Sequence, residues 1–316
     1  FAIEDREIGV RTSVIPGAYG ESVVMRLLDP KMISIPLEEL GINKRLFEVI
    51  NREIEKPNGL ILNTGPTGSG KTTSLYAFLN KIYTPEMKII TIENPIEYHL
   101  EGIVQTQVDT KRGYTFLEGL RSALRQDPDV IMIGEIRDLE TARTAINSAL
   151  TGHLVISTLH TNNAAGTIPR LVDLGVNPKI ISSALTLALA QRLVRKLCEA
   201  CKVEDVQTDP EREVIDRILA GIATDRPKNH GKIWRSKGCQ VCNNTGYTGR
   251  VPVIEGILMD KKIEDALQHN PSEREIMLAA KDQNLLTMSQ DGVLKILEAV
   301  TSMNEVQRVV DLFHMD

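Results

Sequence analysis

A glycine-rich motif, GPTGSGKT, begins at Gly65 and satisfies the pattern G-x-x-x-x-G-K-[ST]. An apolar run, Leu60–Leu62, precedes it and a segment of helical pattern follows, which disfavours the alternative of a glycine-rich turn with a chance lysine. Backbone N–H groups in such a loop wrap phosphates at the start of a helix, which predicts binding of ATP. Lys71 is expected to reach the β- and γ-phosphates, and Thr72 to ligate Mg²⁺. The residues expected to hold the nucleotide are Gly65, Pro66, Thr67, Gly68, Ser69, Gly70, Lys71, Thr72 and Thr73.

Two glutamates follow other apolar runs. Glu135 comes after the run 129–134 at the distance expected for a Walker B strand, but Gly134 stands where many ATPases carry aspartate. Glu135 must therefore act on Mg²⁺ or water by itself or through a bridging water, unless it is only a helix N-terminal glutamate. Glu93 ends the preceding strand, at the sheet edge where ligands bind, and is a candidate to orient or deprotonate the attacking water. Its alternative is a surface acid in the turn at Pro95.

His160 lies just past a further buried run, close to Thr158. A histidine there is able to donate a hydrogen bond to the γ-phosphate and to sense its loss. The alternative is a structural histidine at a strand end, but Thr158 and the preceding motifs favour function.

The N-terminal segment contains a pair of arginines. Residues 8–15 and 21–28 have the pattern of a hairpin in which paired residue numbers sum to 37. This register keeps the apolar residues on one side and places Arg11 directly opposite Arg26. Like charges that face each other across two strands are destabilising unless an anion lies between them.

A second pair, Arg121 and Arg125, shares one face of the predicted helix 116–126. Two unneutralised arginine pairs in an acidic protein predict a polyphosphate ligand, with some arginines acting as fingers. The alternative is ordinary salt bridging to nearby acids.

Four cysteines occur as two Cys-x-x-Cys pairs, Cys198 with Cys201 and Cys239 with Cys242. Two such knuckles brought together form a tetrahedral zinc site. The 37 intervening residues exceed the usual zinc-ribbon spacing, and disulfides are the alternative. We expect zinc.

Short buried strands alternate with helices from Leu60 onward, which predicts an α/β fold with a mostly parallel sheet covered on both faces. The expected strands are 59–63, 88–92, 103–107, 130–134 and 153–159, and the expected helices are near 71–83, 116–126, 138–149 and 163–174.

Composition limits the other possibilities. The 316 residues are enough for two compact units plus appendages. A net charge of −5 gives no global positive field for nucleic acid or an acidic membrane, and aromatic residues make up only 4%. The beginning, at Phe1, is typical of a chain entered partway through a domain.

The motifs resemble those of the secretion ATPase superfamily of the PilB and GspE type. The stretches similar to its Walker A, Asp box, Walker B and His box are 57–72, 92–97, 120–138 and 150–162. Residues 191–195 and 246–250 also match, so the resemblance covers nearly the whole chain. By similarity, Arg11, Arg26, Arg121 and Arg125 meet nucleotide phosphate, Glu93 activates water and Glu135 serves Mg²⁺. Asn94 stands where the family usually has aspartate in the Asp box.

The resemblance implies a RecA-like P-loop ATPase domain preceded by a small PAS-like α+β domain. The implied divisions are a PAS-like tail at 1–28, a linker at 29–36, an ATPase core at 37–191, a tetracysteine zinc module at 192–255 and a helical C-terminal region at 256–316.

The implied function is that of a homohexameric, Mg²⁺-dependent ATPase that powers assembly of type IV pili or of the type II secretion pseudopilus. Such a protein is cytoplasmic and peripheral at the inner membrane, where it reaches the membrane only through partners, above all a platform protein. Retraction-type relatives generally lack the four cysteines, so these favour extension or secretion.

Two other functions are possible. A RecA-like nucleic-acid motor needs a basic loop with interleaved aromatics, which the composition does not favour, so no nucleic-acid partner is expected. A scaffold that binds ATP without turnover is disfavoured by the complete set of Lys71, Thr72, Glu93 and Glu135.

Overall fold

The computed structural model describes residues 2–3, 6–28, 35–223 and 226–313. Most of the predicted linker lies outside these ranges. Glu4 and Asp5, two of the nearby acids in the salt-bridging alternative for the hairpin arginines, also lie outside them. None of the helices within them combines the length and apolarity that a bilayer crossing requires.

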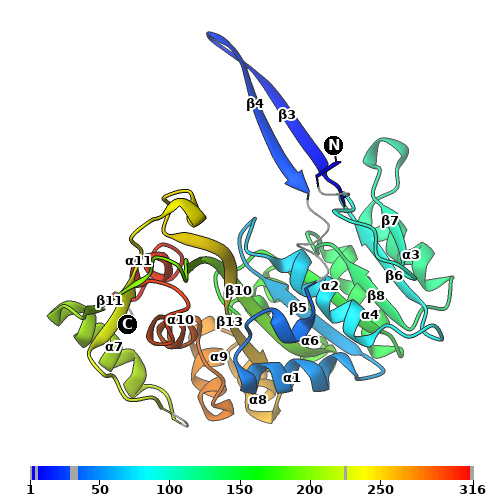
Figure 1. Cartoon of the computed structure of the whole chain (residues 1–316). Helices are drawn as coiled ribbons and strands as arrows, with labels where there is room; N and C mark the ends of the chain where they lie inside the picture. Colours follow the sequence, from blue (N-terminus) through cyan, green and yellow to red (C-terminus); the bar gives the residue numbers. More distant parts are fainter. Residues whose placement is uncertain (1, 4–5, 29–34, 224–225, 314–316) are drawn as a thin grey trace.

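A seven-stranded sheet forms the centre of the molecule, in the order β13-β10-β5-β9-β8-β6-β7 (Figure 1). Its strands are β5 (Gly59–Thr64), β6 (Ile89–Glu93), β7 (Val104–Gln107), β8 (Val130–Ile133), β9 (Leu154–Leu159), β10 (Leu185–Leu197) and β13 (Tyr247–Leu258). All neighbours pair in parallel except β10 and β13, which are antiparallel. The predicted, mostly parallel α/β sheet is confirmed.

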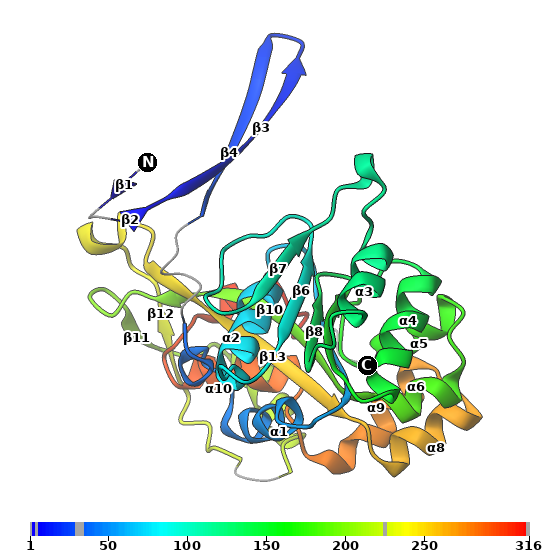
Figure 2. The same cartoon turned by 90° about the vertical axis from the view of Figure 1, so that its right-hand side faces the viewer.

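Helices cover both faces of this sheet (Figure 2). Along β5, Ile61 packs in a core with α1 (Lys44–Ile54) and α2 (Lys71–Ile82), whereas Leu60 and Leu62 belong to the opposite core. This alternation is the two-residue period of a strand buried on both faces. The opposite core contains α3 (Phe116–Leu124), α4 (Leu139–Leu150), α5 (Thr167–Asp173) and α6 (Pro178–Ala184).

The C-terminal helices α8 (Lys261–His269), α9 (Glu273–Ala280), α10 (Met288–Leu297) and α11 (Met303–Gln307) add to that same core. The predicted strands and helices are therefore found with ends shifted by a few residues. Strands β10 and β13 were not among the strands predicted from the sequence. The implied divisions at 191/192 and 255/256 fall inside these two strands, and the division into domains remains a prediction.

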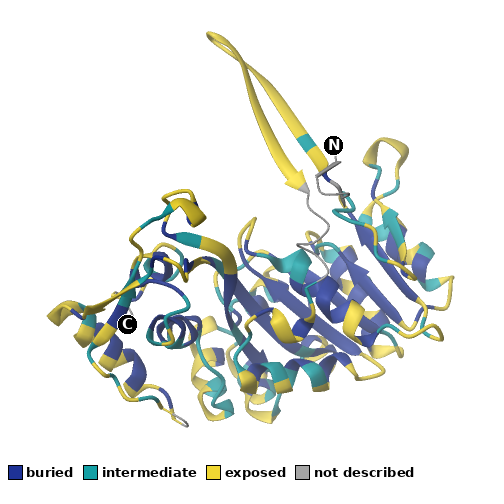
Figure 3. Ribbon diagram, in the orientation of Figure 1, coloured by how far each residue is buried: buried dark blue, intermediate teal, exposed yellow. Residues whose placement is uncertain are grey.

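A hairpin of β3 (Gly9–Gly17) and β4 (Gly20–Leu28) projects from this body, preceded by the short strands β1 (Ala2–Ile3) and β2 (Arg6–Glu7) (Figure 1). Its register pairs Arg11 with Arg26, as predicted. Along β3 only Arg11 is half-buried and the other residues are exposed. Figure 3 shows the hairpin coloured almost entirely as exposed.

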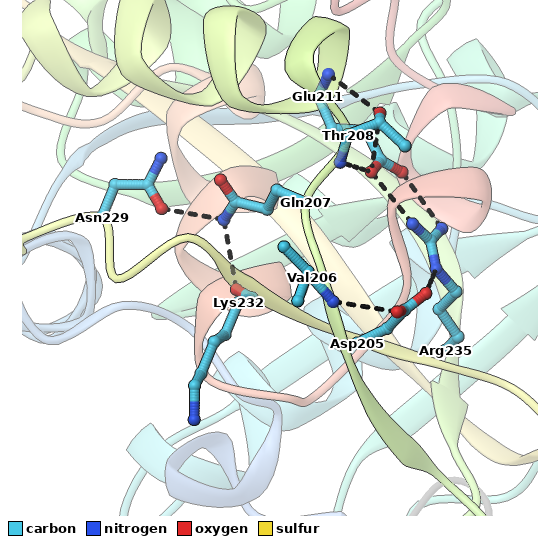
Figure 4. A network of polar contacts seen from close by, with 8 residues as sticks. All are labelled: Asp205, Val206, Gln207, Thr208, Glu211, Asn229, Lys232 and Arg235. Carbon is cyan, nitrogen blue, oxygen red and sulfur yellow. Dashed lines mark hydrogen bonds and ion pairs between the residues drawn. The ribbon is translucent and has the colours of Figure 1, made fainter.

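A small unit lies between the two cysteine pairs, consisting of β11 (Val203–Val206), α7 (Asp209–Ala220) and β12 (Lys232–Arg235). Arg235 holds it together, because its guanidinium contacts Asp205 on β11 and donates two 3.0 Å hydrogen bonds to Glu211 at the start of α7 (Figure 4). Glu211 also accepts hydrogen bonds from Thr208 in a capping box that begins the helix.

Candidate functional site

The glycine-rich loop joins β5 to α2, as the motif predicts. Gly68 and Gly70 have φ of +80° and +89°, in the left-handed region that glycine adopts without strain. Gly65 is required for space as well, because a Cβ there would lie 2.5 Å from the carbonyl oxygen of Gln191. Gly70 is the N-cap of α2 and has no side chain to cap it, so helix N–H groups are left for an anion.

Lys71 is the first residue of α2, and its Nζ donates to the carbonyl oxygens of Gly65 at 2.7 Å and Pro66 at 3.1 Å. Burial lowers its pKa, Glu135 opposes this, and Arg192 lowers it further. The buried hydroxyl of Ser69 has no hydrogen-bond partner within the described residues. A loop with a basic amine and an unpaired buried hydroxyl fits the phosphates of a nucleotide.

Glu135 and His160 come together beside this loop. One carboxylate oxygen of Glu135 lies 3.6 Å from His160 Nε2, and the other lies 2.6 Å from a guanidinium nitrogen of Arg137. That hydrogen bond raises the pKa of Arg137. The Thr158 hydroxyl donates a 2.6 Å hydrogen bond to the carbonyl of Gly134, which ties the end of β9 to the residue before Glu135.

Glu93 occupies a different environment at the same edge of the sheet. Its side chain is buried and accepts hydrogen bonds from Tyr76 at 2.5 Å, Thr91 at 2.6 Å and Gln105 at 3.0 Å. Burial and the neighbouring Glu93 raise the pKa of Tyr76, so the phenol stays protonated and donates. Glu93 therefore links α2 to β7 and is not a surface acid.

The four arginines divide into paired and unpaired members, and the prediction that none is neutralised is wrong for two of them. Arg11 forms an ion pair with Glu97, and Arg121 forms one with Glu118 at 2.9 Å, because acids lie within reach of each. Within the described residues, Arg125 donates only to the Ser122 hydroxyl and Arg26 has no partner. Arg121 and Arg125 are exposed on and beside α3, and no contact in the described part of the chain joins them to the glycine-rich loop.

The four cysteine sulfurs form one cluster, within 4.8 Å of one another. Three of the separations are 3.9 Å (Cys198–Cys239), 3.8 Å (Cys201–Cys242) and 3.7 Å (Cys239–Cys242). A tetrahedron of thiolates about 2.3 Å from a zinc ion has edges of about 3.8 Å. Burial raises the pKa of Cys242, but hydrogen bonds from the N–H groups of Cys239 and Gly246 and with the thiols of Cys239 and Cys201 outweigh it and bring the pKa to about 6. The donor set and its spacing fit zinc.

The side chains of β10 that hold the loop were not predicted as part of the site. Gln191 is buried and donates to the Ser69 carbonyl at 2.7 Å, while its oxygen accepts from Asn63 and Ser74. Arg192 donates to the Asn162 carbonyl, just beyond His160. The available signal was a glutamine and an arginine that directly follow the apolar run Ala184–Ala190.

Glu255 on β13 was missed as well. Its carboxylate accepts a 2.9 Å hydrogen bond from Ala164 N, just beyond the His160 segment, and another of 2.9 Å from Met288 N at the start of α10. Burial raises its pKa. This carboxylate joins the His160 segment to the C-terminal helices.

A P-loop after β5, a glutamate after β8 and a histidine after β9, at the carboxyl edge of one sheet, define a RecA-like P-loop nucleotide-binding protein. The chain belongs to the family of type II/IV secretion system proteins, whose model matches residues 1–308. The predicted resemblance is confirmed.

The chain is similar both to proteins of type II secretion systems and to a type IV pilus assembly ATPase. The type II secretion system protein E of Aeromonas hydrophila is 47% identical over 307 residues, which are 97% of this chain and 60% of that protein. The type IV pilus assembly ATPase PilB of Thermus thermophilus is 45% identical over 302 residues, covering 95% of this chain and 33% of PilB. The crystal structure of the pilus retraction motor PilT with bound ADP matches with a TM-score of 0.63 at 27% identity, covering 96% of this chain and 78% of PilT. This chain thus spans 60% or less of the length of both curated relatives.

Proposed function

We propose that this chain is the ATP-hydrolysing motor part of a machine that assembles type IV pili or a type II secretion pseudopilus. The observation that carries the proposal is the convergence of Lys71, Glu135 and His160 at one edge of the sheet, beside a loop shaped for phosphates. The similarity to a secretion protein E and to a pilus assembly ATPase supports both machines equally.

In the proposed reaction, the N–H groups of the loop bind the phosphates and Lys71 exchanges its contacts with Gly65 and Pro66 for phosphate oxygens. Mg²⁺, held by Thr72 and Glu135, would neutralise charge on the β- and γ-phosphates. A water oxygen attacks the γ-phosphorus, the bond to the β–γ bridging oxygen breaks, and the proton of the water leaves to a carboxylate. His160, beside Glu135, donates to the γ-phosphate.

Glu93 is proposed to orient the attacking water. Because Tyr76, Thr91 and Gln105 already donate to its carboxylate, it must exchange one of these donors for water in order to act. The Glu135 carboxylate is more accessible than that of Glu93, since its side chain is 14% exposed. It also lies next to Lys71.

A ring of six copies accounts for the second arginine pair. Arg121 and Arg125 are exposed, so they are available to the nucleotide of a neighbouring copy. We expect the ring to work in the cytoplasm against a platform protein of the inner membrane, which is its only link to the bilayer. The four cysteines are proposed to bind one structural zinc ion.

The direct test is Mg²⁺-dependent ATP hydrolysis by the Lys71→Ala variant. We expect turnover to fall at least roughly 100-fold, because the amine that meets the phosphates is lost. Lys81→Ala is the matched control, since Lys81 lies on the same helix but pairs with Glu38 at 2.6 Å. ATP hydrolysis at the wild-type rate by Lys71→Ala would overturn the proposed function.

A further inference from the structure

Arg11 of the hairpin and Glu97 of the sheet edge form a two-pronged ion pair. Arg11 Nη1 lies 3.1 Å from Glu97 Oε1, and Arg11 Nη2 lies 3.1 Å from Oε2. The side chains are 36% and 23% exposed, so the pair is accessible to solvent and to ligands. The two residues are 86 positions apart in the chain, so the contact joins separate parts of the fold.

This pair ties the projecting hairpin to the body of the molecule. Arg11 is the one half-buried residue along β3, and the described side chains of β4 are exposed. Arg26 lies directly opposite Arg11 in the register. The carboxylate of Glu97 therefore neutralises one of two arginines that would otherwise repel each other across the hairpin.

Glu97 stands at the edge of the sheet where the nucleotide is proposed to bind. It lies four residues after Glu93, the last residue of β6, in the connection that leads to β7. In a parallel sheet the carboxyl ends of β5 and β6 share one edge, so the P-loop after β5 and the Glu97 segment after β6 face the same side. Arg11 is thus held at this edge by a carboxylate.

A guanidinium binds a carboxylate or a phosphate in the same two-pronged geometry, and Glu97 occupies the fork formed by the two Nη atoms of Arg11. Arg11 cannot present this fork to both anions at once. If Arg11 presents this fork to the γ-phosphate of ATP, a contact that the family resemblance implies, it must first leave Glu97.

We propose that Glu97 is a positioning residue that competes with the γ-phosphate for Arg11. Glu97 holds the hairpin to the sheet edge, and ATP displaces Glu97 by presenting a phosphate to the same guanidinium. Because ADP has no γ-phosphate, Arg11 stays with Glu97 when ADP is bound. An anion, either Glu97 or the γ-phosphate, therefore lies beside the Arg11–Arg26 pair in both states. The position of the hairpin then depends on whether the γ-phosphate is present. This inference rests on the proposed function and on the contact between Arg11 and nucleotide phosphate that the family resemblance implies.

The test compares dissociation constants for the non-hydrolysable analogue AMPPNP and for ADP, measured by displacement of a fluorescent nucleotide. In Glu97→Gln the competitor of the phosphate is lost, so AMPPNP should bind roughly two- to fivefold more tightly, the range for a partly exposed ion pair. ADP affinity should not change. Arg11→Ala should weaken AMPPNP binding and leave ADP binding unchanged. In the Arg11→Ala background, Glu97→Gln should have no further effect.

The matched control is Glu38→Gln, which removes the carboxylate of another accessible ion pair and should leave both constants unchanged. Weaker AMPPNP binding by Glu97→Gln would overturn the inference, because it would mean that Glu97 assists the phosphate contact. An unchanged ratio of the AMPPNP and ADP dissociation constants in Glu97→Gln would overturn it as well. So would an equal effect of Glu97→Gln in the Arg11→Ala background. Failure of the proposed function is a separate result, since Lys71→Ala would then retain nucleotide hydrolysis.

Discussion

The side-chain amide of Gln191 donates a 2.7 Å hydrogen bond to the carbonyl oxygen of Ser69, and thereby fastens the P-loop to the neighbouring strand β10. Its oxygen accepts from Asn63, before the loop, and from Ser74, in the first turn of α2. One buried amide thus fixes the loop at its beginning, middle and end. A loop that is shaped before the ligand arrives binds it with a smaller loss of conformational entropy.

Replacing Gln191 with leucine should weaken nucleotide binding and lower stability together. The substitution leaves buried polar groups of Asn63, Ser69 and Ser74 without a partner, which costs about 1–3 kcal/mol for each group that finds no substitute. We expect a lower melting temperature and a higher dissociation constant for ADP. Gln268→Leu, at an exposed position of α8, is the control. An unchanged ADP affinity in Gln191→Leu would show that the loop keeps its shape without this amide.

The local parts of the fold and site were predictable from sequence because their signals are local. The motif around Lys71 fixes a strand, a loop and a helix within a few residues, and alternation in the hairpin determines which residues face each other. The register that pairs Arg11 with Arg26 needed only the turn and the apolar pattern.

The remaining features depend on contacts between distant segments. The partner of Arg11 is Glu97, 86 positions away, and no pattern near either residue indicates it. The roles of Gln191 and Glu255 depend on β10 and β13 joining the sheet beside β5, which the sequence analysis did not predict. The burial of Glu93 by donors on α2 and β7 is a further consequence of tertiary packing.

The four cysteines should hold about one zinc ion per chain, measured by elemental analysis of the purified protein. Cys242→Ser should remove the zinc and lower the free energy of unfolding by roughly 4 kcal/mol, because metal binding is coupled to folding. Thr245→Ala is the matched control, because it removes a neighbouring hydroxyl that donates to the Cys242 carbonyl and leaves all four sulfurs in place, so this variant should retain the metal. A folded protein without metal, or one with disulfides, would contradict this assignment.

Glu135 and Glu93 should respond differently to replacement by glutamine. Glu135→Gln should lower turnover and raise the Mg²⁺ concentration needed for half-maximal activity, because Gly134 leaves no neighbouring aspartate to serve the ion. Glu93→Gln should lower turnover by roughly 100-fold without changing that Mg²⁺ concentration, since its proposed task is to orient water. Titration of activity with Mg²⁺ separates the two effects. Wild-type turnover by Glu93→Gln would show that the roles assigned here are wrong.

The ion pairs of Arg235 should give the β11–α7–β12 unit a stability that is lost in acid (Figure 4). Burial by itself raises the pKa of Glu211, but hydrogen bonds from Arg235 and Thr208 outweigh it, so the pKa lies below its ordinary value of 4.5. A carboxyl whose pKa is lowered on folding stabilises the fold above its unfolded-state pKa, and that contribution disappears as the pH falls through the lowered value.

Arg235→Met keeps the bulk of the side chain and removes its charge. The wild type should therefore exceed this variant in stability by about 1 kcal/mol at pH 7, and the difference should shrink as the pH falls below 4.5. Trp234 is the only tryptophan of the chain and lies on β12 beside Arg235, so its fluorescence during urea unfolding reports on this unit. Arg226→Met, at an exposed position between α7 and β12, is the matched control. It should unfold like the wild type both at pH 7 and below pH 4.5. A stability difference between wild type and Arg235→Met that stays constant from pH 7 to well below pH 4.5 would mean that packing by the side chain, and not its charge, holds the unit together.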